Sequence, residues 1–187
     1  DAKGPVGLAK VTVSKDDVEL GFARSNQDGR VTFDIAPGAY SVSVEANGRP
    51  VVELPLTVEG DSSDTVEVDL PGYVVANVKD ENGKPIPCKV EFIGQGDTPN
   101  PFFGPDTFVY SIHNLRYTPD GQFRQEIAPG RYAVVVSHGN EYDAVFATVD
   151  VSEGKETELQ AVLRRSVDTT GWVSSDFHSH SSPSGDN

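Results

Sequence analysis

Apolar and polar residues alternate along short stretches of this chain, and most stretches end at Gly or Pro. The alternation is clearest in residues 41–44, 73–78 and 133–136. A period of two residues is typical of a strand with one buried face, and no long stretch has the spacing of an amphipathic helix. The pattern therefore predicts an all-β sandwich with tight turns.

One block of this pattern occurs twice. Residues 28–40, DGRVTFDIAPGAY, match residues 120–132, DGQFRQEIAPGRY, without a gap. In each copy Asp-Gly predicts a tight turn into a strand, and Ala-Pro-Gly predicts the next turn because Gly readily adopts a positive φ. Each block is thus expected to form a strand, a turn and a second strand. The chain is predicted to hold two copies of one β-domain.

The repeat extends toward the N-terminus, where residues 1–11 align with residues 80–90. In the second copy this block follows the predicted strand 73–78, whereas the first copy has no counterpart of that strand. Truncation of a longer protein is the simplest explanation. Domain one is therefore expected to lack its opening strand. Such a gap leaves either an open sheet edge or a place for a strand supplied from elsewhere.

The repeat also sets the expected domain limits. Domain one is expected to cover residues 1–70 and to close on strand 64–70, and domain two to cover residues 71–165 and to close on strand 156–163. Each closing strand follows an acidic turn that contains Gly. Two domains of this size suit a chain of 187 residues, and the linker Leu70-Pro-Gly72 is expected to place them end to end.

Copy two carries an insertion within residues 94–117. Lys10 and Asp28 are 18 positions apart in copy one, whereas Lys89 and Asp120 are 31 apart in copy two. Exposed aromatic rings bind sugars and protein partners, so one interpretation is a binding surface. The alternative is that the rings cap the core of their own domain. The aromatic residues concerned are Phe102, Phe103, Phe108, Tyr110 and Tyr117.

Composition narrows the function classes. The formal net charge of −14 disfavours nucleic acid, whose phosphates are bound by clusters of Lys and Arg. No apolar stretch is long enough to predict a membrane span, and the single Cys88 cannot form an internal disulfide. Neither the Gly-x-Ser-x-Gly motif of serine hydrolases nor a Walker-type phosphate loop occurs.

The last sixteen residues, WVSSDFHSHSSPSGDN, hold candidate metal ligands. In an extended segment His178 and His180 point to the same side and could both bind one metal ion. A catalytic metal usually needs at least three protein ligands, so this pair is incomplete. His113 and His138 would add ligands if their loops lay at the same end of domain two. The alternative is a disordered polar terminus, although Trp172 before it favours a connection to another folded unit.

Two resemblances follow from these motifs. The repeated Gly/Pro-rich openings and the Asp-Gly and Ala-Pro-Gly-x-Tyr centres resemble the carboxypeptidase-regulatory-like, transthyretin-like β-sandwich family over about residues 1–163. A more specific resemblance covers PGRY (129–132), SHGNEYD (137–143), LRRSVD (163–168) and GWVSSDFHSH (171–180). These segments together resemble the carbaryl-hydrolase-like (CehA/McbA-type) branch of the polymerase-and-histidinol-phosphatase (PHP) superfamily.

The second resemblance implies that the β-domains precede a metal-dependent barrel on the same polypeptide, with residues 166–187 as the linker and first barrel strand. It implies that His178 and His180 bind a divalent metal, Zn, Mn or Fe, and that Asp186 matches an acidic position. The full protein would hydrolyse phosphoester or related ester bonds, in an extracellular or periplasmic setting. This chain alone would be a non-catalytic accessory region, without a metal of its own. The alternatives are a glycan- or protein-binding module and a structural spacer.

Overall fold

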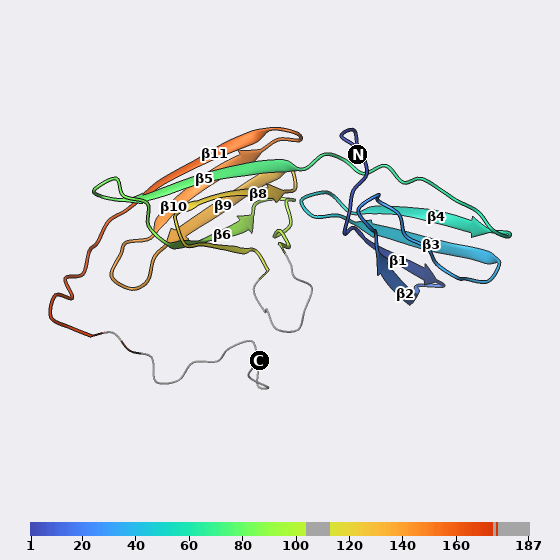
Figure 1. Ribbon diagram of the computed structural model, residues 1–187, viewed down its shortest axis with the longest axis horizontal. Coiled ribbons are helices and arrows are strands. Elements are labelled where there is room, and N and C mark those ends of the chain that lie inside the picture. Colours follow the sequence, from blue (N-terminus) through green and yellow to red (C-terminus); the bar gives the residue numbers. More distant parts are fainter. Residues whose placement is uncertain (104–112, 174, 176–187) are drawn as a thin grey trace.

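The computed structural model describes residues 1–103, 113–173 and 175 of the chain. The described residues form eleven β-strands and no helix, and the strands belong to three sheets. The prediction of an all-β sandwich fold is therefore confirmed (Figure 1). The described residues include no helix that is long and apolar enough to cross a membrane.

The first sheet is antiparallel and belongs to the N-terminal unit, which we define as residues 1–70. Its strand order is β2-β1-β3-β4. The alternating side chains of β1 and β3 pack on a small cluster that includes Val13, Tyr40 and Val42. The strands are β1 (Lys10–Lys15), β2 (Val18–Arg24), β3 (Gly38–Glu45) and β4 (Val52–Val58).

The C-terminal unit, residues 71–165, contains two sheets of order β10-β9-β6-β7 and β11-β5-β8. In the second sheet β5 is the middle strand, parallel to β11 and antiparallel to β8. The strands are β5 (Gly72–Asp80), β6 (Cys88–Gly94), β7 (Leu115–Thr118), β8 (Gln122–Ile127), β9 (Gly130–Ser137), β10 (Val145–Val151) and β11 (Glu156–Leu163).

The core of the C-terminal unit lies between these two sheets. Val74 of β5, Phe92 of β6 and Tyr132 of β9 are completely buried in it. The Tyr132 hydroxyl donates a hydrogen bond to the Ala128 carbonyl at 2.8 Å, so its polar end is satisfied inside an apolar core. Burial raises the pKa of Tyr132 to about 12, which keeps this hydroxyl protonated as the donor.

The repeated sequence produces repeated geometry. Gly38 of β3 pairs with Val58 of β4, and its counterpart Gly130 of β9 pairs with Val151 of β10. Tyr40 also donates its hydroxyl to the Ala36 carbonyl, at 2.6 Å, as Tyr132 does to Ala128. The four-stranded sheet of each unit thus has the same strand order and the same pairing between its last two strands.

The second layer differs between the units. Residues 30–35 and 64–70 were expected to be strands, but neither joins a sheet, so these two predictions are wrong. Their counterparts in the C-terminal unit, β8 and β11, both pair with β5. A β-strand needs a neighbouring strand that hydrogen-bonds to its backbone. The described part of the N-terminal unit has no strand in the place of β5, so these two segments have no such neighbour.

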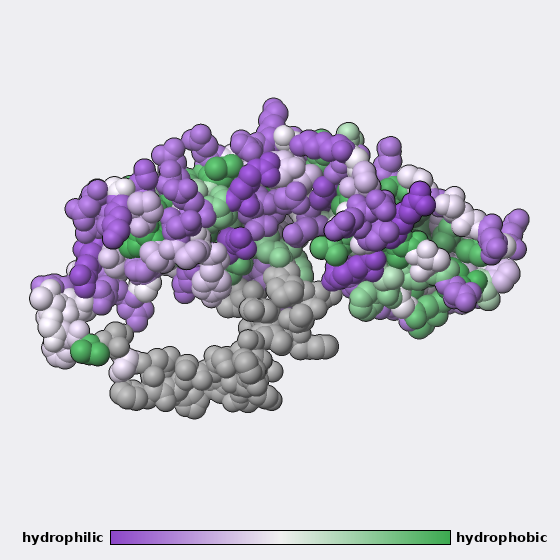
Figure 2. All heavy atoms as spheres, viewed as in Figure 1, coloured by the Kyte–Doolittle hydropathy of each residue, from purple (hydrophilic) through white to green (hydrophobic). Residues whose placement is uncertain are grey.

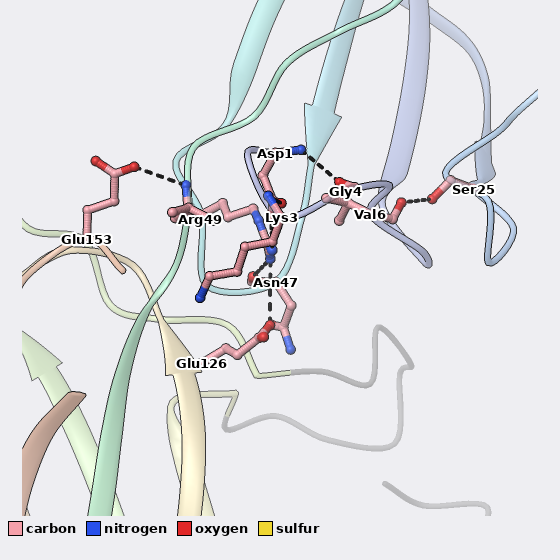
Figure 3. Close-up of polar contacts among 10 residues, drawn as sticks. Asp1, Lys3, Gly4, Val6, Ser25, Asn47, Arg49, Glu126 and Glu153 are labelled. Carbon is pink, nitrogen blue, oxygen red and sulfur yellow. Dashed lines mark hydrogen bonds and ion pairs between the residues drawn. The ribbon is translucent and has the colours of Figure 1, made fainter. Parts of the chain in front are cut away.

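The two units meet at the turn between β3 and β4 (Figure 3). Arg49, whose side chain is 9% exposed, lies 2.6 Å from the Asp1 carboxylate in its own unit and 3.6 Å from the Glu126 carboxylate of β8. The Leu70 backbone N–H donates to the Glu153 carboxylate at 3.3 Å, which holds the linker. The guanidinium thus joins the two units through opposite charges.

Gly48 allows the close approach at this junction. Its φ is +67°, and a Cβ there would lie 2.8 Å from the Ile127 nitrogen and 2.9 Å from the Glu126 carbonyl carbon. Both contacts are backbone atoms, which cannot rotate away as a flexible side chain could. Only glycine therefore fits between the units.

We predict that Gly48→Ala lowers stability by about 1–3 kcal/mol and separates the two units, because positive φ is strained and the new methyl meets backbone. The matched control is Gly83→Ala, which has a φ of +79° but no atom within 4 Å of the added Cβ. Thermal unfolding and small-angle scattering measure both effects. Equal destabilisation by the two variants, with no change in scattering, would contradict the close junction.

Candidate interface at the C-terminal end of the sandwich

The candidate metal ligands His178, His180 and Asp186 lie outside the described residues, as do Phe108 and Tyr110. Within the described part of the chain, no three His, Cys, Asp or Glu side chains are grouped to hold a metal ion. The described residues do show how the chain leaves the sandwich toward those histidines. This exit lies at the end of the C-terminal unit that is farther from the N-terminal unit (Figure 1).

After β11 ends, the chain is held against the loop between β9 and β10. The backbone N–H groups of Ser166 and Val167 both donate to the Glu141 carbonyl, at 2.9 and 3.1 Å. Asp143 donates its N–H to the Arg164 carbonyl at 2.9 Å. These backbone bonds continue the sheet pairing beyond its last strand, so residues 164–167 follow a fixed course.

Three side chains complete this attachment, and we call Glu141, Arg165 and Thr169 the exit clamp. The Arg165 guanidinium lies 2.6 Å from one oxygen of the Glu141 carboxylate. The Thr169 hydroxyl donates to the other oxygen at 2.7 Å and accepts from Arg165 at 2.5 Å. Each member therefore bonds to both of the others. A closed set of charged hydrogen bonds is more specific in geometry than a single ion pair.

The Glu141 carboxylate of the clamp stays ionised at neutral pH. The Thr169 hydrogen bond and the Arg165 guanidinium hold the pKa of Glu141 below its usual value. The pKa of Asp168 is also lowered, mainly because it accepts hydrogen bonds from the Thr170 hydroxyl and backbone N–H. Both carboxylates are therefore ionised over the physiological range, and Glu141 keeps its attraction for Arg165.

A shallow groove of about 630 Å³ lies beside the exit clamp. Its walls are residues 138–142 on one side and Val167, Thr169, Trp172 and Val173 on the other. The His138 ring packs edge-on against Tyr142, with ring centroids 4.8 Å apart. Trp172 and Val173 are 82% and 90% exposed. Two adjacent, exposed apolar side chains beside the clamp form a surface suited to contact with another folded unit.

The suggestion that His113 and His138 meet in one site is wrong. The neighbour of His113, Asn114, bonds to Phe92 near the end of β6, whereas the neighbour of His138, Ser137, is close to Lys89 at its beginning. About three residues of strand, roughly 10 Å, separate these levels along β6. The histidines therefore belong to opposite ends of the sheet. Only His138 is on the side of the exit clamp.

The described aromatic residues of the insertion divide into two kinds. Phe103 packs on the core, edge-on to Phe92 with ring centroids 5.6 Å apart. Phe102 is 48% exposed and stacks on His113 at 4.2 Å, and Tyr117 is 68% exposed. The core-capping interpretation thus describes Phe103, while Phe102 and Tyr117 present rings to solvent.

A second apolar surface lies on the N-terminal unit. Val18, Leu20 and Phe22 alternate along β2 and are 54–61% exposed. Figure 2 shows apolar side chains gathered over this part of the unit. Lys10 places its ammonium 5.1 Å from the centre of the Phe22 ring, so part of the apolar surface lies under a charge.

Comparison with known proteins gives no family for this chain. The sequence matches no known family and no curated protein. Solved structures with some likeness include GBS52, the minor pilin of Streptococcus agalactiae, with 14% identity over 92% of this chain and 88% of that one, and a TM-score of 0.40. The Bacillus anthracis TIE protein has 12% identity over 86% of this chain and 30% of that one, with a TM-score of 0.36.

Domains 3–5 of the extracellular part of Drosophila OTK have 12% identity over 85% of this chain and 55% of that one, with a TM-score of 0.20. The chain thus spans less than two thirds of both the TIE protein and the OTK fragment. These likenesses are too low to assign an activity, a ligand or a location.

We predict that acid opens the exit clamp. The folded-state pKa of Glu141 is lowered, so its contribution to stability is present above the usual carboxylate pKa and is lost as pH falls through the folded value. The backbone N–H of Trp172, the only tryptophan, donates to the backbone carbonyl of Thr169, so its fluorescence reports on the clamp. Its emission should change below about pH 4.5.

Glu141→Gln should remove this transition, because the side chain can no longer gain a proton in that range. Asp168→Asn is the matched control and should keep the transition, since Asp168 bonds to Thr170 outside the clamp. Identical acid titrations of the unaltered protein and Glu141→Gln would contradict the assignment.

Proposed function

We propose that the two β units are a non-catalytic accessory region that holds a metal-dependent hydrolase barrel of the PHP type on the same polypeptide. The observation that carries the proposal is the exit clamp. Glu141, Arg165 and Thr169 fix the direction of the chain just before Trp172 and the His178-Ser-His180 segment. A terminus without a partner gains nothing from such a fixed exit, whereas a connection between folded units does.

The surroundings of the clamp support the same role. Val167, Trp172 and Val173 are exposed apolar residues beside the exit clamp, and side chains of this kind can be buried against a neighbouring domain. Arg49 fixes the opposite end of the C-terminal unit to the N-terminal unit. The region thus has a fixed contact at each end of one sandwich, which suits a rigid support for a catalytic unit.

The chemistry would come from the segment that follows. His178 and His180 supply imidazole nitrogens, which suit Zn, Mn and Fe, and Asp186 would add a carboxylate oxygen. A divalent metal held there lowers the pKa of bound water and stabilises charge on a phosphoester during hydrolysis. The remaining ligands would come from the barrel, so residues 1–187 by themselves are expected to be inactive.

The test uses a chain that continues past Asn187 as encoded by the natural gene. We predict that it contains Zn, Mn or Fe by elemental analysis and hydrolyses bis(p-nitrophenyl) phosphate. His178→Ala should lower both metal content and activity by at least about 100-fold, because a first ligand is lost. Lys84→Ala, in an exposed turn of the C-terminal unit, is the control and should change neither.

A natural-length protein that is free of metal and cleaves neither phosphoesters nor carboxyl esters would contradict the proposal. So would full activity in His178→Ala. Loss of metal together with activity separates a ligand role from a folding defect, provided that the circular dichroism spectrum of the variant is unchanged.

One observation favours a second candidate, glycan or protein binding through the insertion. Phe102 presents a half-exposed ring that is stacked on His113 and thereby held in place. If this surface binds a glycan, Phe102→Ala should abolish retention on a glycan array without lowering the melting temperature. Phe146→Ala, which removes an exposed ring on β10 outside the insertion, is the control. Absence of any retained glycan by the unaltered protein counts against this candidate.

A further inference from the structure

The N-terminal unit has the flanks of a three-stranded sheet without its middle strand. In the C-terminal unit β5 lies between β11 and β8 and pairs with both. The counterparts of these two neighbours are residues 64–70 and 30–35, which are drawn as coil in Figure 1 and join no sheet. The opposite sheet of the unit is complete and has the same strand order as its counterpart.

Both unpaired segments keep the alternation of strands. Val31, Phe33 and Ile35 are half-buried while Thr32 and Asp34 between them are exposed. Residues 64–70 follow the same rule, since Val66, Val68 and Leu70 point inward and Glu67 and Asp69 point outward. Phe33, Ile35 and Val66 also pack against the N-terminal cluster. The segments thus have the side-chain geometry of strands and lack the neighbour that would give them hydrogen bonds.

The core beneath them is incompletely covered. Among the described residues, seven hydrophobic side chains are buried in the N-terminal cluster and seventeen in the C-terminal cluster. Leu56 and Val58 of β4 are half-buried, whereas their counterparts Val149 and Val151 are each 5% exposed. Ile35 is likewise half-buried where Ile127 is fully buried. A layer that covers the C-terminal core is therefore missing from the N-terminal one.

The turn at Asp1 shows where the missing strand would end. Gly4 donates its N–H to the Asp1 carbonyl at 3.0 Å, and Gly83 donates to the Asp80 carbonyl at the same distance. The Asp1 carboxylate accepts the Lys3 N–H at 2.9 Å, as the Asp80 carboxylate accepts the Asn82 N–H at 2.9 Å. Asp80 is the last residue of β5. Asp1 therefore stands where a strand like β5 would finish.

We propose that the N-terminal unit is an acceptor for one extended polypeptide strand of β5-like sequence, which it takes up between residues 30–35 and 64–70. The strand runs antiparallel to residues 30–35, parallel to residues 64–70, and ends beside Asp1. Its apolar residues alternate, since Val74, Ala76 and Val78 are the β5 side chains that face the core. Strand addition of this kind combines backbone hydrogen bonds with side-chain burial.

The register follows from the repeat. Ala76 of β5 lies opposite Phe123 of β8 and Leu159 of β11. Phe123 corresponds to Val31 and Leu159 to Val66 in the N-terminal unit. The added strand should therefore place a small apolar residue between Val31 and Val66. A shift by one residue would turn its apolar side chains toward solvent, so the register is strongly selected.

The first experiment joins a copy of residues 72–79, GYVVANVK, directly to Asp1 of the 187-residue chain. Hydrogen exchange by mass spectrometry then compares the joined and the unaltered chains. Exchange in residues 30–35 and 64–70 should slow by at least about tenfold, because their backbone amides gain hydrogen-bond partners or are shielded from water. The melting temperature should rise by several degrees. The matched control carries Asp at the three inward positions of the added copy and should show neither effect.

The second experiment adds the same sequence as a free peptide to the unaltered chain. One peptide should bind per chain and protect residues 30–35 and 64–70, and the chain with the joined strand should not bind it. Protection of these two segments in either format supports the proposal. Lack of protection in both formats, or protection only at the exposed edges β2 and β4, overturns it.

Discussion

The middle strand β5 determines which part of this molecule forms a complete two-layer sandwich. β5 pairs with β11 over residues 73–80 and with β8 over residues 72–77, and it thereby brings two alternating segments into one layer over the core. Hydrogen bonding and burial depend on each other here, because an alternating segment covers a core well only when its backbone is paired. Where β5 is present the core is closed, and where the described chain has no such strand the flanking segments stay unpaired.

The other contacts build on this arrangement. β5 begins at the linker, where Gly48 and Arg49 bring the N-terminal unit against Glu126 and Ile127. β11, its parallel partner, ends at the exit clamp, where Glu141, Arg165 and Thr169 direct the following segment. The two strands thus connect the junction at one end of the sandwich to the exit at the other. A region built in this way fixes the position of one unit relative to the next, which is the role proposed for it.

The alternation and the repeat were sufficient to predict the fold class and the strands β3, β5, β8, β9 and β11. They predicted strands at 30–35 and 64–70 wrongly, because alternation reports which side chains point inward and carries no information on a hydrogen-bonding neighbour. The exit clamp was missed for a related reason. Glu141 and Arg165 belong to separate sequence motifs and Thr169 belongs to neither, and only the fold shows that the loop and the chain after β11 are adjacent. The proposal for His178 and His180 rests on sequence alone.

The measurement that tests this account most directly is hydrogen exchange on the unaltered 187-residue chain, with the two units compared segment by segment. Residues 122–127 and 156–163 should exchange slowly, at rates set by opening of the whole C-terminal sandwich. Residues 30–35 and 64–70 should exchange at least about a hundredfold faster while β1 and β3 stay protected. Equal, slow exchange in all four segments would contradict the claim that the middle strand determines the second layer.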